Sequence, residues 1–314
     1  MLNRLETTLV AIALSAITLT SYGQEEAPIR MGISRNPGRS VDFQFEKKEP
    51  GTRTLVFKFN DLRNTSIVNE QTVEIRGYAG TALKIKPQDV NQPVLFDSYS
   101  YRSLRGRLRP KYKPEFRYIL PYSNGKKVTV REAGFVGEKY FGNKTPEDWK
   151  SYNFYTQQED TVIAIRKGLV VAVKDTYDTN NSPNAVFTTL RNSIVVEHED
   201  GTLARYSGFK SGVLVVVGKT VYPGTALGIN SKFNRNSSIY NIQINVHYLK
   251  SDDTDANKGK NLSNEQTLYG FVTPHFYTPS QPDIILKDKS DYIAGSSAEI
   301  VKLEMSKKEL KSFK

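Results

Sequence analysis

The sequence predicts an all-β protein: a small N-terminal β-sandwich, then an antiparallel β-barrel or sandwich domain, then a short C-terminal helix. Two observations support this prediction. Short runs rich in β-branched and aromatic residues are bounded by Gly, Pro, Asn or Asp, which is typical of strands joined by turns. Helix-compatible spacing is found instead in the last segment, where Ile300, Leu303, Leu310 and Phe313 are separated by Lys and Glu.

Residues 1–24 have the pattern of a secretory signal peptide. Arg4 stands near the start, an apolar run of 11 residues extends from Leu9 to Leu19, and small and polar residues follow. This run is too short to cross a bilayer of roughly 30 Å, and no later stretch approaches the ~20 residues that a spanning helix needs. We therefore expect an exported protein, periplasmic or extracellular, with no transmembrane segment in the mature chain. A retained N-terminal anchor is the alternative interpretation.

Composition narrows the classes of partner. The chain has 314 residues, no cysteine and a formal net charge of +11. Without cysteine there are neither disulfides nor thiolate metal sites, so packed cores must provide the stability. The length that remains after cleavage is ample for two domains. Outside the cytoplasm, such a charge suggests an anionic cell-wall or membrane surface before it suggests DNA or RNA, and we expect no nucleic-acid partner.

The first β domain is expected at 25–116. Its predicted strands lie at 54–59, 72–75, 82–85 and 94–96. Near its end, residues 99–118 mix seven basic residues with aromatic ones and include two prolines. Basic and aromatic residues together can form a nucleic-acid surface. The prolines and the position between two β regions favour an inter-domain connection with a solvated basic face, with contact to an anionic polymer as the second interpretation.

The second β domain is expected at 117–250. Its strongest predicted strands lie at 162–165, 169–173, 193–196 and 213–217, and glycines punctuate them at turn positions. Residues 251–314 are expected to form a C-terminal extension that carries the terminal helix.

Several phrases of the second domain resemble the lysostaphin/LytM family of zinc endopeptidases, also called duplicated-hybrid-motif peptidases. They follow one another in the family's order: ILPYSNG at 119–125, FYTQQEDTVIAIRKGLVVA at 154–172, IVVEHEDGTLARY at 194–206, the glycine-containing turns at 216–228, and NIQINVHY at 241–248. The resemblance covers roughly residues 117 to 250. It implies a compact antiparallel β-barrel-like or sandwich core with an open groove, in which active members cleave peptidoglycan cross-bridges.

The resemblance also shows which positions would hold zinc. Active members use a His-x-x-x-Asp pair and the second His of a His-x-His strand, and further histidines assist the bound water. Carried over, the Asp position holds Asn153 and the first His position holds Trp149, or a residue near Tyr140 if an insertion moves it upstream. The two positions of His-x-His hold Asn241, an assisting position, and Gln243, a ligand position.

A second assisting-His position holds Gly208. The only histidines are His198, His247 and His275, so none precedes residue 198. Amides are weak neutral donors for zinc. We therefore expect neither a metal nor another cofactor, and no catalytic residue of the family's type.

His198 and His247 are candidates to replace the missing zinc ligands. His198 matches a histidine that many family members carry before the Asp-Gly turn, and we interpret it as structural. Period-2 alternation places His247 on one strand face with Asn241, Gln243 and Asn245, so these four residues are the predicted lining of the groove. With no partner carboxylate from the expected strand, a rebuilt metal site is disfavoured. His275 is interpreted as a surface or loop residue.

These observations favour a non-catalytic relative of peptidoglycan metalloendopeptidases, which binds cell-wall material or regulates a cell-wall hydrolase. The expected partners are therefore peptidoglycan or such a hydrolase, and an anionic envelope surface is a further candidate. The first alternative is an endopeptidase that works with substituted metal ligands. The second is a structural or adhesive exported β-protein whose groove is filled by Trp149 or the loop at 230–240.

Overall fold

The computed structural model describes residues 29–135, 138, 144–177, 191–232, 238–256 and 267–312. The predicted signal peptide, Tyr140 and Phe313 lie outside this part of the chain. Strands dominate, and the described helices are two short ones near the C-terminal end, so the all-β prediction is confirmed. Within the described part, no helix is long and apolar enough to cross a membrane.

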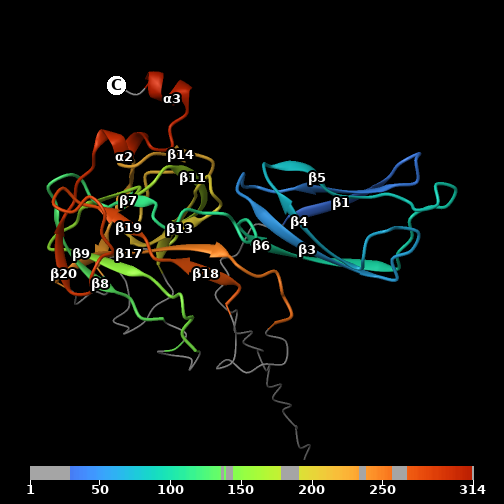
Figure 1. Ribbon diagram of the computed structural model, residues 1–314, viewed down its shortest axis with the longest axis horizontal. Helices are drawn as coiled ribbons and strands as arrows, with labels where there is room; N and C mark the ends of the chain where they lie inside the picture. Colours follow the sequence, from blue (N-terminus) through green and yellow to red (C-terminus); the bar gives the residue numbers. More distant parts are fainter. Residues whose placement is uncertain are drawn as a thin grey trace, which may run out of the picture.

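The N-terminal domain is a β-sandwich of two antiparallel three-stranded sheets (Figure 1). One sheet has the order β1 (Arg30–Arg35), β2 (Val41–Glu46), β5 (Ala79–Ile85); the other has the order β4 (Glu70–Ile75), β3 (Arg53–Asn60), β6 (Ser98–Arg105). Alternation along β2 buries Val41, Phe43 and Phe45 and exposes Gln44 and Glu46. Phe43 meets Phe57 of the opposite sheet edge-to-face, with ring centroids 5.4 Å apart, so one aromatic core joins the two sheets.

The second domain is built on a ten-stranded sheet. Its main path runs β14 (Thr220–Val221), β11 (Gly168–Lys174), β12 (Asn192–Glu197), β13 (Leu203–Phe209), β17 (Tyr240–Leu249), β9 (Tyr152–Thr156), β8 (Lys127–Glu132), β20 (Ser290–Ile293), and both β16 (Ser231–Lys232) and β18 (Tyr269–Val272) pair with β17. Two smaller pairs join it: β10 (Thr161–Ile163) with β15 (Ala226–Ile229), and β7 (Arg117–Ile119) with β19 (His275–Tyr277). Strands from residues after 250 therefore complete this sheet.

The long strand β17 shows why this sheet has two different faces. Ile242, Ile244 and Val246 are buried in the main core of the domain, and the residues between them point to the other face because the strand repeats every two residues. That other face is polar along β17. Near β11 and β12 it carries a small apolar cluster of Val171, Val195 and Leu203, which is where the N-terminal domain packs.

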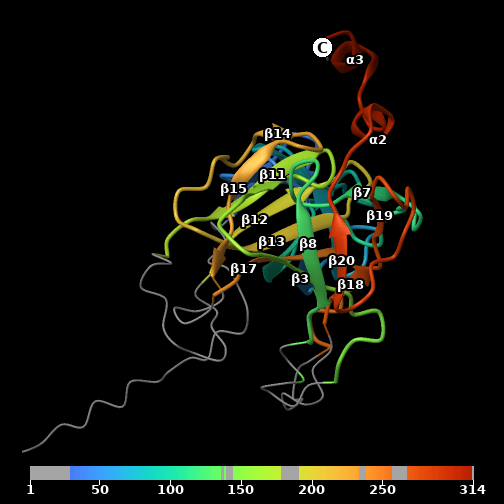
Figure 2. The same ribbon diagram turned by 90° about the vertical axis from the view of Figure 1, so that its left-hand side faces the viewer.

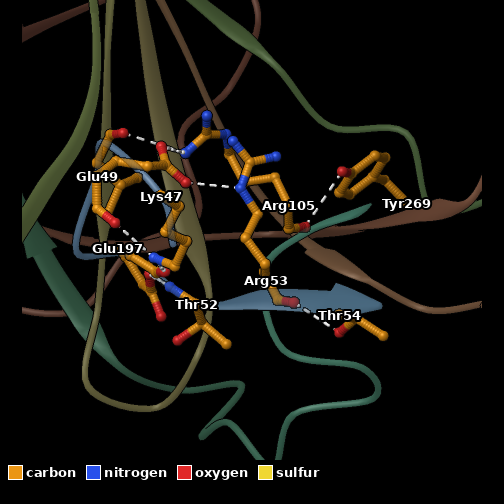
Figure 3. A network of polar contacts seen from close by, with 11 residues as sticks. Lys47, Glu49, Thr52, Arg53, Thr54, Arg105, Glu197 and Tyr269 are labelled. Carbon is orange, nitrogen blue, oxygen red and sulfur yellow. Dashed lines mark hydrogen bonds and ion pairs between the residues drawn. The ribbon is translucent and has the colours of Figure 1, made fainter. Parts of the chain in front are cut away.

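A polar network ties the N-terminal domain to this region (Figure 3). The backbone N–H of Thr52 donates to Oε2 of Glu197 over 2.7 Å, and Arg105 donates to the carbonyl of Val171 over 3.1 Å. The approach is close because residue 51 is glycine: a Cβ there would lie 2.4 Å from Cγ1 of Val171. The domain contact therefore depends on backbone packing as well as on charge.

The charged groups of this network are buried and paired. Glu49 accepts from Arg53 over 2.6 Å and from Arg105 over 2.7 Å. Burial alone would raise the pKa of Glu49, but the two guanidiniums outweigh it and hold the pKa below its usual value. Burial lowers the pKa of Lys47, which donates to the carbonyls of Glu49 and Gly51, to about 8. A buried pair of this kind fixes geometry, since removing one partner leaves the other uncompensated.

The basic segment 99–118 is tied to the rest of the molecule. Its arginines make ionic or hydrogen-bond contacts with residues far away in sequence: Arg102 with the carbonyl of Thr254, Arg105 with Glu49, Arg107 with Glu74, Arg109 with Asp252, and Arg117 with Glu299. Residues 99–105 belong to strand β6 of the N-terminal sandwich. The interpretation of the whole segment as a connection is therefore wrong for this part, and only residues 106–116 connect the two β regions.

The C-terminal segment forms two helices in place of the single helix expected. α2 (Ala298–Lys302) is capped by Ser297, which accepts from the N–H of Ile300. α3 (Lys307–Ser312) begins anew because Ser306 and Glu309 form a reciprocal capping box: each side chain accepts from the other's backbone N–H. Ile300 is buried as its spacing predicts, whereas Leu303 and Leu310 are 46% and 41% exposed.

Candidate functional site

Strand pairing brings together three of the predicted positions. Gln243 of β17 is the register partner of Asn153 of β9, and Asn241 lies two residues away on the same face. Nδ2 of Asn241 donates to Oδ1 of Asn153 over 3.1 Å, and Nε2 of Gln243 donates to Oγ of Ser151 over 3.1 Å. We call Ser151, Asn153, Asn241 and Gln243 the amide cluster. It is a neutral hydrogen-bonded group. It includes two positions that the family resemblance assigns to zinc ligands, Asn153 and Gln243, and one that it assigns to an assisting histidine, Asn241.

The amide cluster retains free hydrogen-bonding capacity. Its bonds use Oδ1 of Asn153 and Nε2 of Gln243, which leaves an amide NH₂ on the first residue and a carbonyl oxygen on the second. Both residues are half-buried. In the described part of the chain, some buried side-chain atoms lack a hydrogen-bond partner, and Nδ2 of Asn153 and Oε1 of Gln243 are not among them. One donor and one acceptor thus remain for solvent or a ligand.

His247 continues the same face of β17. Its Nδ1–H donates to Oδ1 of Asn245 over 2.9 Å, so Nε2 carries the lone pair. Burial lowers the pKa of His247 to about 3, and the positive charges of Arg205 and Arg105 act in the same direction. The imidazole is therefore neutral at physiological pH. Its ring lies edge-on to Tyr269, with centroids 5.4 Å apart.

A cationic edge borders the amide cluster. Tyr155 is the register partner of Asn241, and the guanidinium of Arg131 lies 5.6 Å from its ring centroid. Burial raises the pKa of Tyr155, and Arg131 and Arg191 oppose this rise. Ser151, Tyr155 and Arg131 are not among the residues predicted for this face. The first two could have been found, because period-2 alternation from Asn153 along the same strand places them on its face.

A side chain at position 208 would be crowded and strained. Its φ is 113°, and a Cβ built there would lie 3.2 Å from the carbonyl oxygen of Asn241. Its own carbonyl accepts from Oγ of Ser231 over 2.9 Å. A histidine at this position would have a φ that L residues rarely adopt and would press on the carbonyl of Asn241, so the backbone disfavours the family's assisting residue here.

Trp149 lies in an aromatic group beside the amide cluster. Its indole N–H donates to the carbonyl of Ala133 over 2.7 Å, and its ring packs edge-to-face on Phe135 and on Phe271, with centroids 4.9 and 4.6 Å away. Phe271 is the register partner of His247. Trp149 therefore joins the predicted face through Phe271 and makes no hydrogen bond to the cluster among those described.

The residues present do not fit zinc. A catalytic zinc site needs about three imidazole, thiolate or carboxylate ligands, and the family positions offer amides, an indole and a glycine. Across the described residues, no group of three or more His, Cys, Asp and Glu is arranged to hold a metal ion. We therefore derive no metal-dependent step for this face.

The other two histidines lie elsewhere. His198 is 2% exposed, and its Nδ1–H donates to the carbonyl of Lys167 over 2.8 Å. Burial lowers its pKa to about 3, and the charge of Arg166 contributes. His275 pairs with Asp283 near the surface, over 2.6 Å.

Two cavities of the described structure lie away from the amide cluster. One of about 350 Å³ lies between the domains and is lined by residues that include Thr52, His198 and Glu304. The other, of about 480 Å³, is lined by residues that include Lys111 and Phe116 and again by Glu304. No sequence signal pointed to either, because their walls come from segments far apart in the chain.

A scan of known protein families finds no family that matches this chain, and a search of curated proteins finds no match either.

Proposed function

We propose that this chain is an exported, non-catalytic relative of the peptidoglycan metalloendopeptidases, and that it binds cell-wall material through the amide cluster. The observation that carries the proposal is the hydrogen bond between Asn153 and Asn241 with Gln243 in register beside them. Residues far apart in sequence form one polar patch that includes two of the zinc-ligand positions and one assisting-histidine position given by the resemblance. Amide groups bind peptides and sugars by hydrogen bonds and do not activate water for their cleavage.

Specific binding to the cell wall must be distinguished from nonspecific electrostatic attraction. A net charge of +11 attracts the protein to any anionic polymer, but salt screens such contacts over about 8–10 Å. Hydrogen bonds from the amide cluster are much less sensitive to salt. A ligand held by the cluster should therefore stay bound at a salt concentration that removes nonspecific attachment.

The test is a pull-down of the mature protein with purified, insoluble peptidoglycan over a range of salt. We expect retention at moderate salt, and its loss in the variant Asn153→Ala/Gln243→Ala. The matched control is Asn91→Ala/Gln92→Ala, two exposed amides of the N-terminal domain. If moderate salt releases the native protein, or if both variants are retained equally, the proposal is wrong.

A second measurement addresses the enzymatic alternative. Protein purified without chelators is analysed for zinc and added to a peptidoglycan turbidity assay. We expect no stoichiometric zinc and no lysis, because the cluster offers amide groups in place of imidazole and carboxylate ligands. Stoichiometric zinc with chelator-sensitive lysis would contradict the non-catalytic assignment.

A further inference from the structure

The C-terminal segment is attached to the sheet domain in two different ways. α2 buries Ile300, which is 3% exposed, in the main core. α3 buries no side chain and projects beyond α2, as Figures 1 and 2 show. The attachments described beyond Leu303 are hydrogen bonds and ion pairs. Contacts of this kind can open without disturbing an apolar core.

The first attachment is a bidentate contact between a guanidinium and a carboxylate. Arg166 donates from Nε and from Nη2 to the two carboxylate oxygens of Glu304, over 2.9 and 2.6 Å. Paired bonds of this geometry are specific for planar carboxylates. Burial alone would lower the pKa of Arg166, but its bonds with Glu304 raise it above the ordinary value.

Arg166 is held in place by groups outside the C-terminal segment. Its guanidinium lies 3.6 Å from the ring centroid of Phe116, its Nη1 is 2.8 Å from Asp200, and the same atom donates to the hydroxyl of Tyr118 over 3.2 Å. The side chain is 3% exposed. The fork that receives Glu304 is therefore preorganised, which lowers the cost of binding a carboxylate there.

A second contact receives Glu309. Nζ of Lys167 lies 2.8 Å from Oε2 of this carboxylate and donates to the carbonyl of Glu304 over 2.8 Å. The hydroxyl of Tyr222 donates to Oε1 of Glu309 over 2.6 Å. Hydrogen bonds from Lys167 and Tyr222 lower the pKa of Glu309. We call Arg166, Lys167 and Tyr222 the carboxylate receptor.

The segment leaves space on both sides of Glu304. The cavities of about 350 and 480 Å³ share this residue and Glu199 as wall residues. Without Glu304, the combined walls hold seven Lys and Arg side chains and four Asp and Glu side chains. Lys111 and Lys113, on the wall of the larger cavity, are both exposed. Arg76 and Arg107 contact Glu74, and Arg117 contacts Glu299, outside these walls. Lys111 and Lys113 make no ion pair among the described residues, so they are the charges that favour an acidic occupant.

We propose that the carboxylate receptor is a binding site for an acidic peptide segment of a partner protein, and that residues 303–312 occupy it in the isolated chain. The partner is recognised by carboxylates spaced like Glu304 and Glu309 and extends into the two cavities. The C-terminal segment acts as an intramolecular competitor, because its tether keeps its effective concentration high, on the order of millimolar. This proposal does not depend on the amide cluster.

The test uses the full chain with Glu304→Gln and Glu309→Gln, in which we expect the segment to detach; we call it the detached variant. The probe is a fluorescent peptide of residues 303–312, and a second probe carries Gln at both glutamate positions. We expect the detached variant to bind the acidic probe at least tenfold more tightly than the native chain, and the Gln probe not to saturate either protein. Adding Lys167→Gln to the detached variant should weaken binding at least fivefold.

Lys308→Gln is the matched control, since it changes a charge in the same segment outside the described receptor contacts; it should leave the native affinity unchanged. Hydrogen exchange provides the fold check: in the detached variant, exchange should rise in residues 303–312 and stay unchanged in the sheet domain. Equal affinity of native and detached chains for the acidic probe, or equal affinity of the two probes, would overturn the proposal. Faster exchange throughout the sheet would also overturn it, because the segment would then be an integral part of the fold.

Discussion

The amide cluster and the carboxylate receptor are both polar groups on the sheet domain, but they are built in opposite ways. The amide cluster is neutral, and adjacent paired strands supply its members. The receptor is ionic: a buried guanidinium meets a carboxylate 138 residues further along the chain. Neutral amides lose little when one bond is broken, whereas a buried ion pair leaves an uncompensated charge. The two groups should therefore differ most in their response to substitution and to pH.

The largest effect is expected from Arg166→Gln. This change leaves Asp200 and Glu304 without their counter-charge, and breaking a buried pair in this way costs about 3–5 kcal/mol. The free energy of unfolding from urea titration measures it. The matched control is Arg117→Gln, whose partner Glu299 is 74% exposed and which should cost at most about 1 kcal/mol. Equal losses would show that the buried contacts of Arg166 contribute no more to the free energy of unfolding than an exposed ion pair does.

A smaller effect comes from pH, through His198. Its pKa in the folded protein is about 3 and the ordinary value is 6.5, so between these pH values the unfolded chain binds more protons. Stability is therefore fully present above pH 6.5 and falls as the pH drops toward 3. At pH 4.5 the loss from this residue is about 2–3 kcal/mol.

The variant His198→Asn tests this assignment, because an amide nitrogen can replace the ring N–H that donates to Lys167. Urea titrations at pH 7 and pH 4.5 should show a smaller difference for the variant than for the native protein. His247, whose pKa is also about 3, keeps its own share in both. An unchanged pH dependence would mean that His198 does not titrate in this range.

The sequence predicts one of these two groups much better than the other. Alternation along 241–248 correctly separates Ile242, Ile244 and Val246, which are buried, from the polar residues between them. Pairing with the strand of Asn153 followed from the family resemblance and not from the local pattern. Local patterns determine faces, and long-range pairing determines neighbours.

The carboxylate receptor was not predicted. The helix expected over 298–313 is interrupted where Glu304 reaches Arg166, and the capping box of Ser306 and Glu309 starts a new helix. The capping box is visible in the sequence as Ser-Lys-Lys-Glu. The ion pair that accompanies the break is not, because any of many basic residues could have been the partner of Glu304.

The backbone beside the amide cluster provides a third test. Gly208→Ala places a Cβ 3.2 Å from the carbonyl oxygen of Asn241 at a φ of 113°, and we expect a loss of about 2 kcal/mol. Gly212→Ala is the control, since its φ is 88° and nothing lies within 4 Å of the added Cβ; it should cost about 1 kcal/mol. Equal costs would mean that the contact with Asn241 adds nothing to the backbone strain.

The smallest effect is expected within the amide cluster itself. Asn241→Ala removes a neutral hydrogen bond to Asn153 and should lower the free energy of unfolding by about 1 kcal/mol. Asn153→Ala removes the same hydrogen bond, but Asn153 is only half-buried, so the loss in free energy of unfolding should be smaller. In a double-mutant cycle the two changes should couple by about 0.5–1 kcal/mol, because they share one bond.

Peptidoglycan retention measured on the same four proteins separates folding from recognition. Asn153 has an amide NH₂ outside the intramolecular bond, so Asn153→Ala should weaken retention more than Asn241→Ala although it destabilises the fold less. Under the proposed function, the buried amide of Asn241 orients Asn153, and Asn153 contacts the ligand. If retention instead follows stability across the four proteins, the cluster only supports the sheet, and the wall must be bound by another surface.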